Sequence, residues 1–222
     1  MEIEKEFLEL LARGASEIGL PLSEKQLGLF REFRREFLIW NSKINLVSIK
    51  TPLDLPIKHF VDSLLPVQFI EHRAGSLLDI GTGAGFPGLP IKIALESLSV
   101  HLIDSSRKKT SFLRDIKGKL GLEGIRITQG RIEQLIADAD LLGSYDIVIS
   151  RAAFKMAELI TIGTPFLAPE GTLIAMKSRD VKTEWAPALS AAEKAGLKLS
   201  ACHERRLPLL GDIRKIVIFS KS

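Results

Sequence analysis

The 222-residue chain has one cysteine, Cys202, and no apolar run near the roughly 20 residues that a membrane span needs. A single cysteine excludes a disulfide framework or a cysteine-based metal site within one chain, and it suits a reducing compartment. The first six residues are acidic on balance, unlike the basic start of a signal peptide. We therefore expect a soluble cytoplasmic protein that holds no metal.

Extremes of composition and charge are absent as well. Apolar residues make up 45% and charged residues 26% of the chain, the balance of an ordinary globular protein. The net charge of +4 is too small to indicate a polyanionic partner by itself. We find no internal repeat and no low-complexity segment, and the length suits one domain with an appendage.

The N-terminal part of the chain contains no clear strand. Apolar residues recur at helical spacing in three stretches, 7–11, 27–40 and 57–65. Ser23 is a predicted N-cap of the second of these helices. We expect a helical extension over residues 1–70, followed by a second unit over residues 71–222.

From residue 75 onward, short apolar runs alternate with amphipathic stretches. Five strands are predicted, at 76–80, 99–103, 125–129, 145–149 and 172–176. Helical character between them predicts a parallel sheet covered on both faces. Residues 197–206 and 214–220 are two further predicted strands with no helix between them, so they should pair antiparallel. The expected fold is α/β and Rossmann-like, with a mostly parallel seven-stranded sheet closed by an antiparallel C-terminal hairpin.

A glycine-rich segment, Asp79–Gly88, follows the first strand and opens a helix. Its glycines let a ligand approach the backbone closely, and their spacing alone suits NAD, FAD or S-adenosylmethionine (SAM). Asp79 would repel the pyrophosphate of a dinucleotide, whereas it would attract the ammonium of SAM. Asp104 ends the next strand, where an acidic residue accepts hydrogen bonds from ribose hydroxyls. The two aspartates and the end hairpin, which is typical of SAM-dependent methyltransferases, favour SAM.

Both aspartates also have a purely structural interpretation. Asp79 could cap a turn, and Asp104 could cap the helix that begins near Ser106. Either residue could fill both roles at once.

Six segments carry more specific motifs. They are Asn45–Ser48, His59–Ser63, Leu78–Gly88, Asp104–Lys109, Arg131–Glu133 and Ser150–Ala152. Together they closely resemble the RsmG (GidB) family of bacterial 16S ribosomal RNA guanine-N7 methyltransferases. The resemblance implies a class I SAM-dependent methyltransferase that modifies N7 of a guanine in a 16S rRNA loop near the decoding centre.

The resemblance also implies which residues contact SAM. They are Gly81, Phe86, Ile132, Glu133 and Arg151, and the general methyltransferase pattern adds Asp79, Gly83 and Asp104. Glu133 and the Ile132 backbone would meet the adenine, although a glutamate in a first helical turn is also favoured by the helix dipole. Phe86 either packs against the cofactor or is a buried aromatic at a helix start.

Arg151 follows the fourth predicted strand, on the side where ligands bind in open α/β sheets. It could hold the SAM carboxylate or an RNA phosphate in a bidentate pair. The structural alternative is an ion pair with Asp79 or Asp146.

Further polar residues lie near the predicted site. His59 and Asp62 could share a hydrogen bond and brace the N-terminal helices, a structural or RNA-positioning role that we favour over catalysis. Nothing places Ser63 on a nucleophile elbow. Asn45 could cap a turn or touch substrate, and Lys177 could contact RNA or be solvated at a strand end.

The predicted chemistry needs no general base, because guanine N7 has a free lone pair at neutral pH and alignment supplies much of the rate. Basic residues cluster in three places: Arg31, Arg34 and Arg35; Arg107–Lys109; and Lys177, Arg179 and Lys182. They could form a phosphate path for 16S rRNA or the small ribosomal subunit, or a solvated charged face.

Three other functions stay open at this point. They are a small-molecule methyltransferase, an NAD-dependent oxidoreductase, which Asp79 disfavours, and a SAM-binding regulator without catalysis. We expect a monomer.

Overall fold

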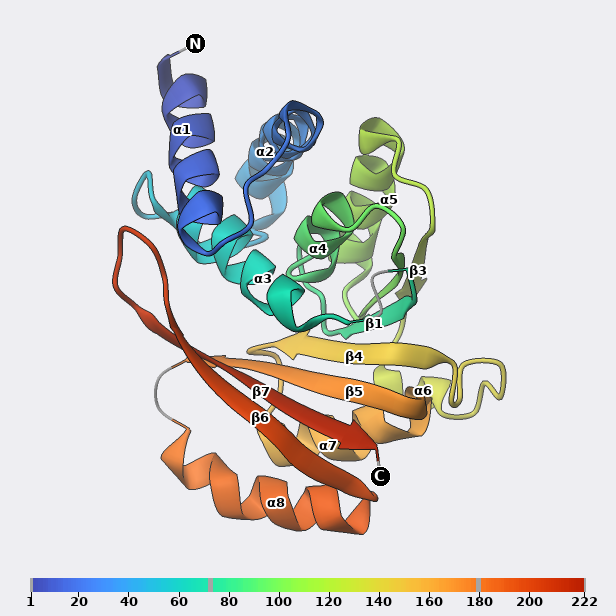
Figure 1. Ribbon diagram of the computed structural model, residues 1–222. Helices are drawn as coiled ribbons and strands as arrows, with labels where there is room; N and C mark the ends of the chain where they lie inside the picture. The colour runs from blue at the N-terminus through green and yellow to red at the C-terminus, as the bar shows by residue number, and fades with distance from the viewer. Residues whose placement is uncertain (1, 72–73, 179–180, 222) are drawn as a thin grey trace.

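The computed structural model describes residues 2–71, 74–178 and 181–221. Its strands form one sheet in the order β3-β2-β1-β4-β5-β7-β6 (Figure 1). They are β1 (Ser76–Ile80), β2 (Ser99–Asp104), β3 (Ile125–Gln129), β4 (Tyr145–Arg151), β5 (Leu167–Ser178), β6 (Leu197–Arg206) and β7 (Ile213–Lys221). The pairs among β1–β5 are parallel, and β7 is antiparallel to both β5 and β6.

Helices cover both faces of this sheet (Figure 1). Helices α4 (Gly88–Ala94) and α5 (Arg107–Leu120) lie on one face, and α6 (Ile132–Leu135), α7 (Met156–Gly163) and α8 (Trp185–Lys194) lie on the other. Short 3₁₀ turns, η3 (Thr164–Phe166) and η4 (Lys182–Glu184), precede β5 and α8. The order of the strands reverses between β1 and β4, and ligands bind outside the carboxyl ends of the strands at such a point.

All the regular secondary structure described before the sheet is helical. It comprises α1 (Glu2–Glu17), α2 (Glu24–Ile44), a π-helical segment η1 (Asp54–Val61), α3 (Asp62–Leu64) and a 3₁₀ segment η2 (Leu65–Phe69). Ser23 caps α2 as predicted, because its side chain accepts from the Gln26 amide and the Gln26 side chain accepts from the Ser23 amide.

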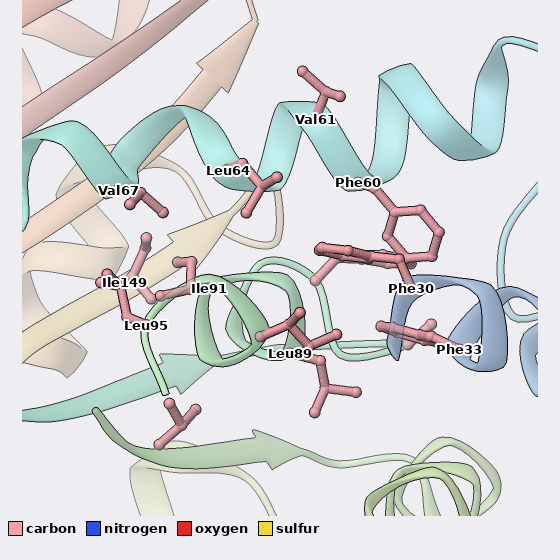
Figure 2. Packing of buried hydrophobic residues seen from close by; sticks show 14 of the residues in the cluster. Phe30, Phe33, Phe60, Val61, Leu64, Val67, Leu89, Ile91, Leu95 and Ile149 are labelled. Carbon is pink, nitrogen blue, oxygen red and sulfur yellow. The ribbon is translucent and has the colours of Figure 1, made fainter. Parts of the chain in front are cut away.

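Aromatic side chains join these helices to the sheet unit. The rings of Phe30 and Phe33 lie 5.1 and 5.0 Å from that of Phe60 (Figure 2), and Phe33 stacks on Phe86 at 5.7 Å. One hydrophobic cluster therefore extends from α1 through α4 and α5 to the sheet. The division near residue 70 stays a prediction, and the core crosses it.

The sequence pattern predicted this architecture closely. All seven expected strands are present, and the C-terminal pair forms the expected antiparallel hairpin. The predicted helices also occur, and α1 (Glu2–Glu17) and α2 (Glu24–Ile44) extend several residues beyond the apolar stretches 7–11 and 27–40 that predicted them.

Candidate active site

The glycine segment makes a tight turn after β1. Gly81 and Gly83 have φ values of +71° and +61°, which side chains rarely adopt. A Cβ atom on Gly81 would lie 2.8 Å from the Cβ of Ala153. The missing side chain at Gly81 therefore lets the loop after β4 pack closely on the turn, and Gly81 itself lines a cleft at the carboxyl end of the sheet.

Asp79 is fully buried beneath this turn. Its Oδ2 accepts hydrogen bonds from Thr82 Oγ1 at 2.6 Å and from the Gly88 amide at 2.8 Å. Its Oδ1 has no hydrogen-bond partner among the described residues. Burial raises the pKa of this carboxyl to about 7, against the lowering effect of the two hydrogen bonds. One oxygen thus holds the turn, and the other is left for a cation or donor.

Asp104, in contrast to Asp79, uses both carboxylate oxygens. Oδ2 accepts from the Gly83 amide at 2.9 Å, and Oδ1 accepts from the Ser106 amide at 2.8 Å. Ser106 itself caps α5 by accepting from the Lys109 amide, so Asp104 supports that helix start from two residues before the cap. Each oxygen keeps a further lone pair, because a carboxylate accepts about four hydrogen bonds.

A cleft of about 440 Å³ opens above these residues, at the ends of β1, β2 and β4. We call it the strand-end cleft. It is lined by Gly81, Asp104, Lys109, Ile132, Glu133, Ala153 and Phe154, among others. Its volume is within the roughly 300–1,000 Å³ of small-molecule sites. Ile132 is buried at the start of α6, and Glu133 is exposed beside it.

Four predicted cofactor residues do not line the strand-end cleft: Asp79, Gly83, Phe86 and Arg151. Phe86 is 3% exposed, and the Arg151 guanidinium lies 5.0 Å from its ring centre. Arg151 Nη1 donates to the Lys58 carbonyl at 3.1 Å and to Asp62 Oδ2 at 3.3 Å. Arg151 therefore does form an ion pair, but its partner is Asp62 of α3. The predicted pairing with Asp79 or Asp146 is wrong.

Arg151 and Asp62 line a second cavity of about 370 Å³. We call it the arginine cavity. It is lined by Lys58, His59, Asp62, Arg151, Ala152, Met176, Lys177, Ser178, Arg214 and Ile216. Asp62 is the only carboxylate that the described residues contribute to this lining. Arg151 and Arg214 both donate to it, Arg214 Nε at 3.1 Å.

Burial governs the ionisation of the groups in the arginine cavity. It raises the pKa of Asp62, an effect that the two arginines oppose. It lowers the pKa of His59 to about 4, and the charge of Arg151 adds to that shift. His59 is therefore neutral at neutral pH, and its ring stacks on Phe86 at 5.3 Å. His59 and Asp62 meet through Arg151, which contacts both side chains.

The sequence reasoning did not single out Arg214 for the site. No motif surrounds it. Arg214 lines the arginine cavity because β7 lies beside β5 in the sheet. The alternation of β7 could have placed its side chain on the same face as Ile216, which lines the same cavity.

Other predicted residues have structural partners. Lys177 pairs with Glu184 at 2.8 Å and donates to the Phe154 carbonyl, so it is neither solvated nor free. Ser63 donates to the His59 carbonyl, and Asn45 caps α2 in a left-handed conformation.

The three basic clusters differ in their surroundings. Arg31 and Arg35 pair with glutamates, and Arg34 lies over the Phe7 ring, which supports the structural interpretation of that group. Lys109 of the second group lines the strand-end cleft. In the third group, Arg179 lies outside the described residues.

No helix in the described ranges is both long and apolar enough to cross a membrane. Solved structures with the same fold include TYW2 of M. jannaschii in complex with AdoMet (SAM), with a TM-score of 0.56 and 17% identity over 72% of this chain and 74% of that one. A second is precorrin-6y C5,15-methyltransferase of Geobacter metallireducens, with a TM-score of 0.54 and 16% identity over 72% and 87% of the two chains.

The sheet order and the strand-end cleft define a class I SAM-dependent methyltransferase. The chain belongs to the family of rRNA small subunit methyltransferase G, because the GidB family model matches residues 26–209. A curated relative from Syntrophus aciditrophicus, ribosomal RNA small subunit methyltransferase G, is 41% identical over 98% of this chain and 90% of its own length. The expected fold class, enzyme class and cofactor SAM are confirmed.

Proposed function

We propose that this enzyme transfers a methyl group from SAM to N7 of a guanine in 16S rRNA. Its family's name specifies the small-subunit rRNA, and the resemblance of its motifs implies the guanine and the N7 atom. The observation that carries the cofactor part is the Oδ1 of buried Asp79, which has no hydrogen-bond partner among the described residues. It lies beneath a glycine turn whose Gly81 lines the strand-end cleft.

The residues of the strand-end cleft, together with the buried Asp79 beneath the glycine turn, suit SAM group by group. Asp79 Oδ1 would accept from the ammonium, and the free lone pairs of Asp104 would accept from the ribose hydroxyls. The Ile132 amide and the Glu133 side chain at the start of α6 would meet the adenine.

The remaining predicted contacts would surround the methionine part of SAM. Gly81 and Gly83 would let the cofactor lie against the backbone, and Gly83 already donates its amide to Asp104. Phe86 and Arg151 would close the site from the side of the N-terminal helices.

The arginine cavity suits an acceptor atom that needs no deprotonation. When bound, SAM supplies an activated methyl group on a sulfonium. A general base would need a pKa near the working pH. His59, with a pKa of about 4, is a weak base at neutral pH, and Asp62 is held by two guanidiniums. An N7 lone pair is available without proton removal, so positioning of the base carries the reaction.

The test is methylation of small ribosomal subunits and of free rRNA with labelled SAM, followed by mapping of the methylated nucleotide. We expect one N7-methylguanine in 16S rRNA, detected by strand cleavage at that base. Label on a different base, or only in small molecules, would refute the proposal. Binding of NAD with exclusion of SAM would refute the cofactor assignment.

The same proposal includes the setting of the reaction. A ribosomal substrate implies that the enzyme acts in the cytoplasm, and we propose that it acts as a monomer. Light scattering of the purified enzyme, alone and with SAM, tests the oligomeric state.

A further inference from the structure

The arginine cavity and the strand-end cleft are separated by one short loop. Arg151 and Ala152 line the cavity, and the next two residues, Ala153 and Phe154, line the cleft. Ala152 has a φ of +55°, a left-handed conformation that is strained for a residue with a side chain. Such strain clusters at functional sites. The acceptor of a methyl group bound in the cleft must lie in an adjoining space, and this cavity is one.

The wall of the arginine cavity is cationic. Among the described residues, it carries the cations of Lys58, Arg151, Lys177 and Arg214 against one carboxylate, that of Asp62. Lys58 and Lys177 each have a carboxylate partner outside the cavity lining, Asp54 at 2.9 Å and Glu184 at 2.8 Å. The two arginines share Asp62, so the cavity suits a ligand that brings negative charge.

Of the two arginines, Arg214 has donors to spare. Its Nε donates to Asp62, and its Nη1 donates to the Ile213 carbonyl at 3.1 Å. Among the described residues, its Nη2 approaches a carboxylate only at Asp212, 3.7 Å away and about half exposed, a weak pair in water. A guanidinium has five N–H donors, and those left on Arg214 can hold two oxygens of one phosphate.

Arg151, by contrast, is occupied by the protein. Its two Nη atoms contact the Lys58 carbonyl, Asp62 and His59, and its plane lies over Phe86. It is also the arginine that lies next to the loop of the strand-end cleft. Asp62 therefore connects Arg151, which lies next to the loop of the strand-end cleft, to Arg214, which has donors left for a ligand in the arginine cavity.

We propose that Arg214 binds a phosphodiester of the substrate RNA next to the acceptor guanine and so positions that nucleotide in the arginine cavity. This inference rests on the proposed function. Methylation at N7 leaves a positive charge on the acceptor base, since no proton is lost. An unneutralised arginine beside it would oppose that charge, and a bound phosphodiester removes this opposition.

The test compares Arg214→Gln with Arg214→Lys in binding to small ribosomal subunits and to a 16S rRNA fragment. For Arg214→Gln we expect RNA affinity to fall about tenfold or more, the loss of one charge-assisted contact. The slope of log K against log salt should become shallower by about 0.7, the value for one phosphate on a single strand. Arg214→Lys keeps the charge and the pair with Asp62, so its slope should stay near wild type while its affinity falls.

Lys198→Gln is the matched control, because it removes one exposed charge from the far end of the same hairpin, opposite Ser220. It should bind RNA as wild type does. Three results would overturn the inference: unchanged RNA affinity in Arg214→Gln, an equal change of slope in Lys198→Gln, or weaker SAM binding in Arg214→Gln with RNA binding intact. Thermal unfolding of each variant shows whether its fold is impaired. If Arg214→Gln is unstable, the lower RNA affinity and unchanged salt slope expected of Arg214→Lys test the inference instead.

Turnover is measured separately from binding. If wild-type enzyme binds RNA through Arg214 but places no methyl group on 16S rRNA, the proposed function fails and the phosphate site stands. If wild-type enzyme methylates the guanine and Arg214→Gln does so with an unchanged KM for RNA, the phosphate site fails alone.

Discussion

Asp62 accepts a hydrogen bond from Arg214 Nε at 3.1 Å, although 152 residues of sequence separate the two. The same carboxylate binds Arg151, so one side chain joins α3, β4 and β7. Replacement of Asp62 by alanine leaves two largely buried guanidiniums without their shared partner. We expect the free energy of unfolding to fall by about 3 kcal/mol, measured by urea denaturation.

Asp212→Ala is the control for that prediction. Its carboxylate lies 3.7 Å from Arg214 and is about half exposed, so the loss should be within about 0.5 kcal/mol. Equal losses in the two variants would mean that the ion pairs of Asp62 do not stabilise the fold.

Asp79→Asn should bind SAM more weakly and yet unfold at a higher temperature. The folded-state pKa of Asp79, about 7, lies above its ordinary value of 3.8, so above neutral pH the fold bears the cost of a buried charge. Removing that charge should stabilise the free protein on the order of 2 kcal/mol near pH 8, and should lower SAM affinity about tenfold or more.

Calorimetry with SAM and thermal unfolding measure the two effects. Asp146→Asn is the control, because Asp146 bonds to Ser76 at the opposite end of the sheet. Its SAM affinity should match that of wild type. A lower melting temperature in Asp79→Asn would contradict the assigned cost of the buried charge.

SAM affinity should depend on pH through Asp79. A bound ammonium favours the ionised carboxylate, so protonated protein must release a proton when SAM binds. Affinity should therefore fall as pH drops below about 7 and level off above it. Titrations near pH 6 and near pH 8 should differ, and the difference should disappear in Asp79→Asn.

Gly81→Ala and Gly28→Ala should have opposite effects. At Gly81 a Cβ would meet Ala153 at 2.8 Å, and φ is +71°, so we expect loss of stability on the order of 1–3 kcal/mol and loss of SAM binding. Gly28 lies within α2 with nothing within 4 Å of the added atom, so alanine should stabilise the protein by about 0.5–1 kcal/mol. Unchanged SAM binding in Gly81→Ala would contradict the close approach of a ligand to the turn.

Two histidines, the buried His101 and the half-buried His59, predict acid sensitivity. Burial lowers the pKa of His59 and of His101 from 6.5 to about 4. The unfolded chain takes up these protons at a higher pH than the folded one, so stability is lost as pH falls from 6.5 toward 4. For His101, which bonds to Tyr145 and Thr128, the loss should be on the order of 2 kcal/mol.

Urea denaturation across that range measures the effect. Asp79 shifts in the opposite direction, so the Asp79→Asn background isolates the histidines. His101→Gln in that background should lose less stability on acidification, and an equal loss would exclude His101 as a source.

The fold could be predicted from sequence because its signals are local. Alternating strand and helix patterns, the cap at Ser23 and the absence of a helix in the C-terminal hairpin each depend on a few neighbouring residues. Several proposed cofactor contacts could be predicted for the same reason, since Asp79 and Asp104 lie at the ends of their strands and Gly81 directly follows the first. The π-helical geometry of η1 had no such signal.

The residues of the arginine cavity could be predicted only in part. Arg151 was found from its strand end, yet its true partner, Asp62, depends on how α3 packs on the sheet. Arg214 lies in a hairpin strand without a motif, and only the pairing of β7 with β5 brings it to the cavity. Contacts between distant segments are set by tertiary packing, which short-range patterns do not encode.

The stacking of Phe33 on Phe86 limits how this enzyme can be re-engineered. Phe86 belongs to the glycine turn, whereas Phe33 belongs to the second helix of the extension, so both contribute to one hydrophobic core. A chimera that grafts a foreign recognition module in place of residues 1–70 would expose the ring beside the turn to water. Such grafts should succeed only when the transplanted helices carry an aromatic residue that restores this stack.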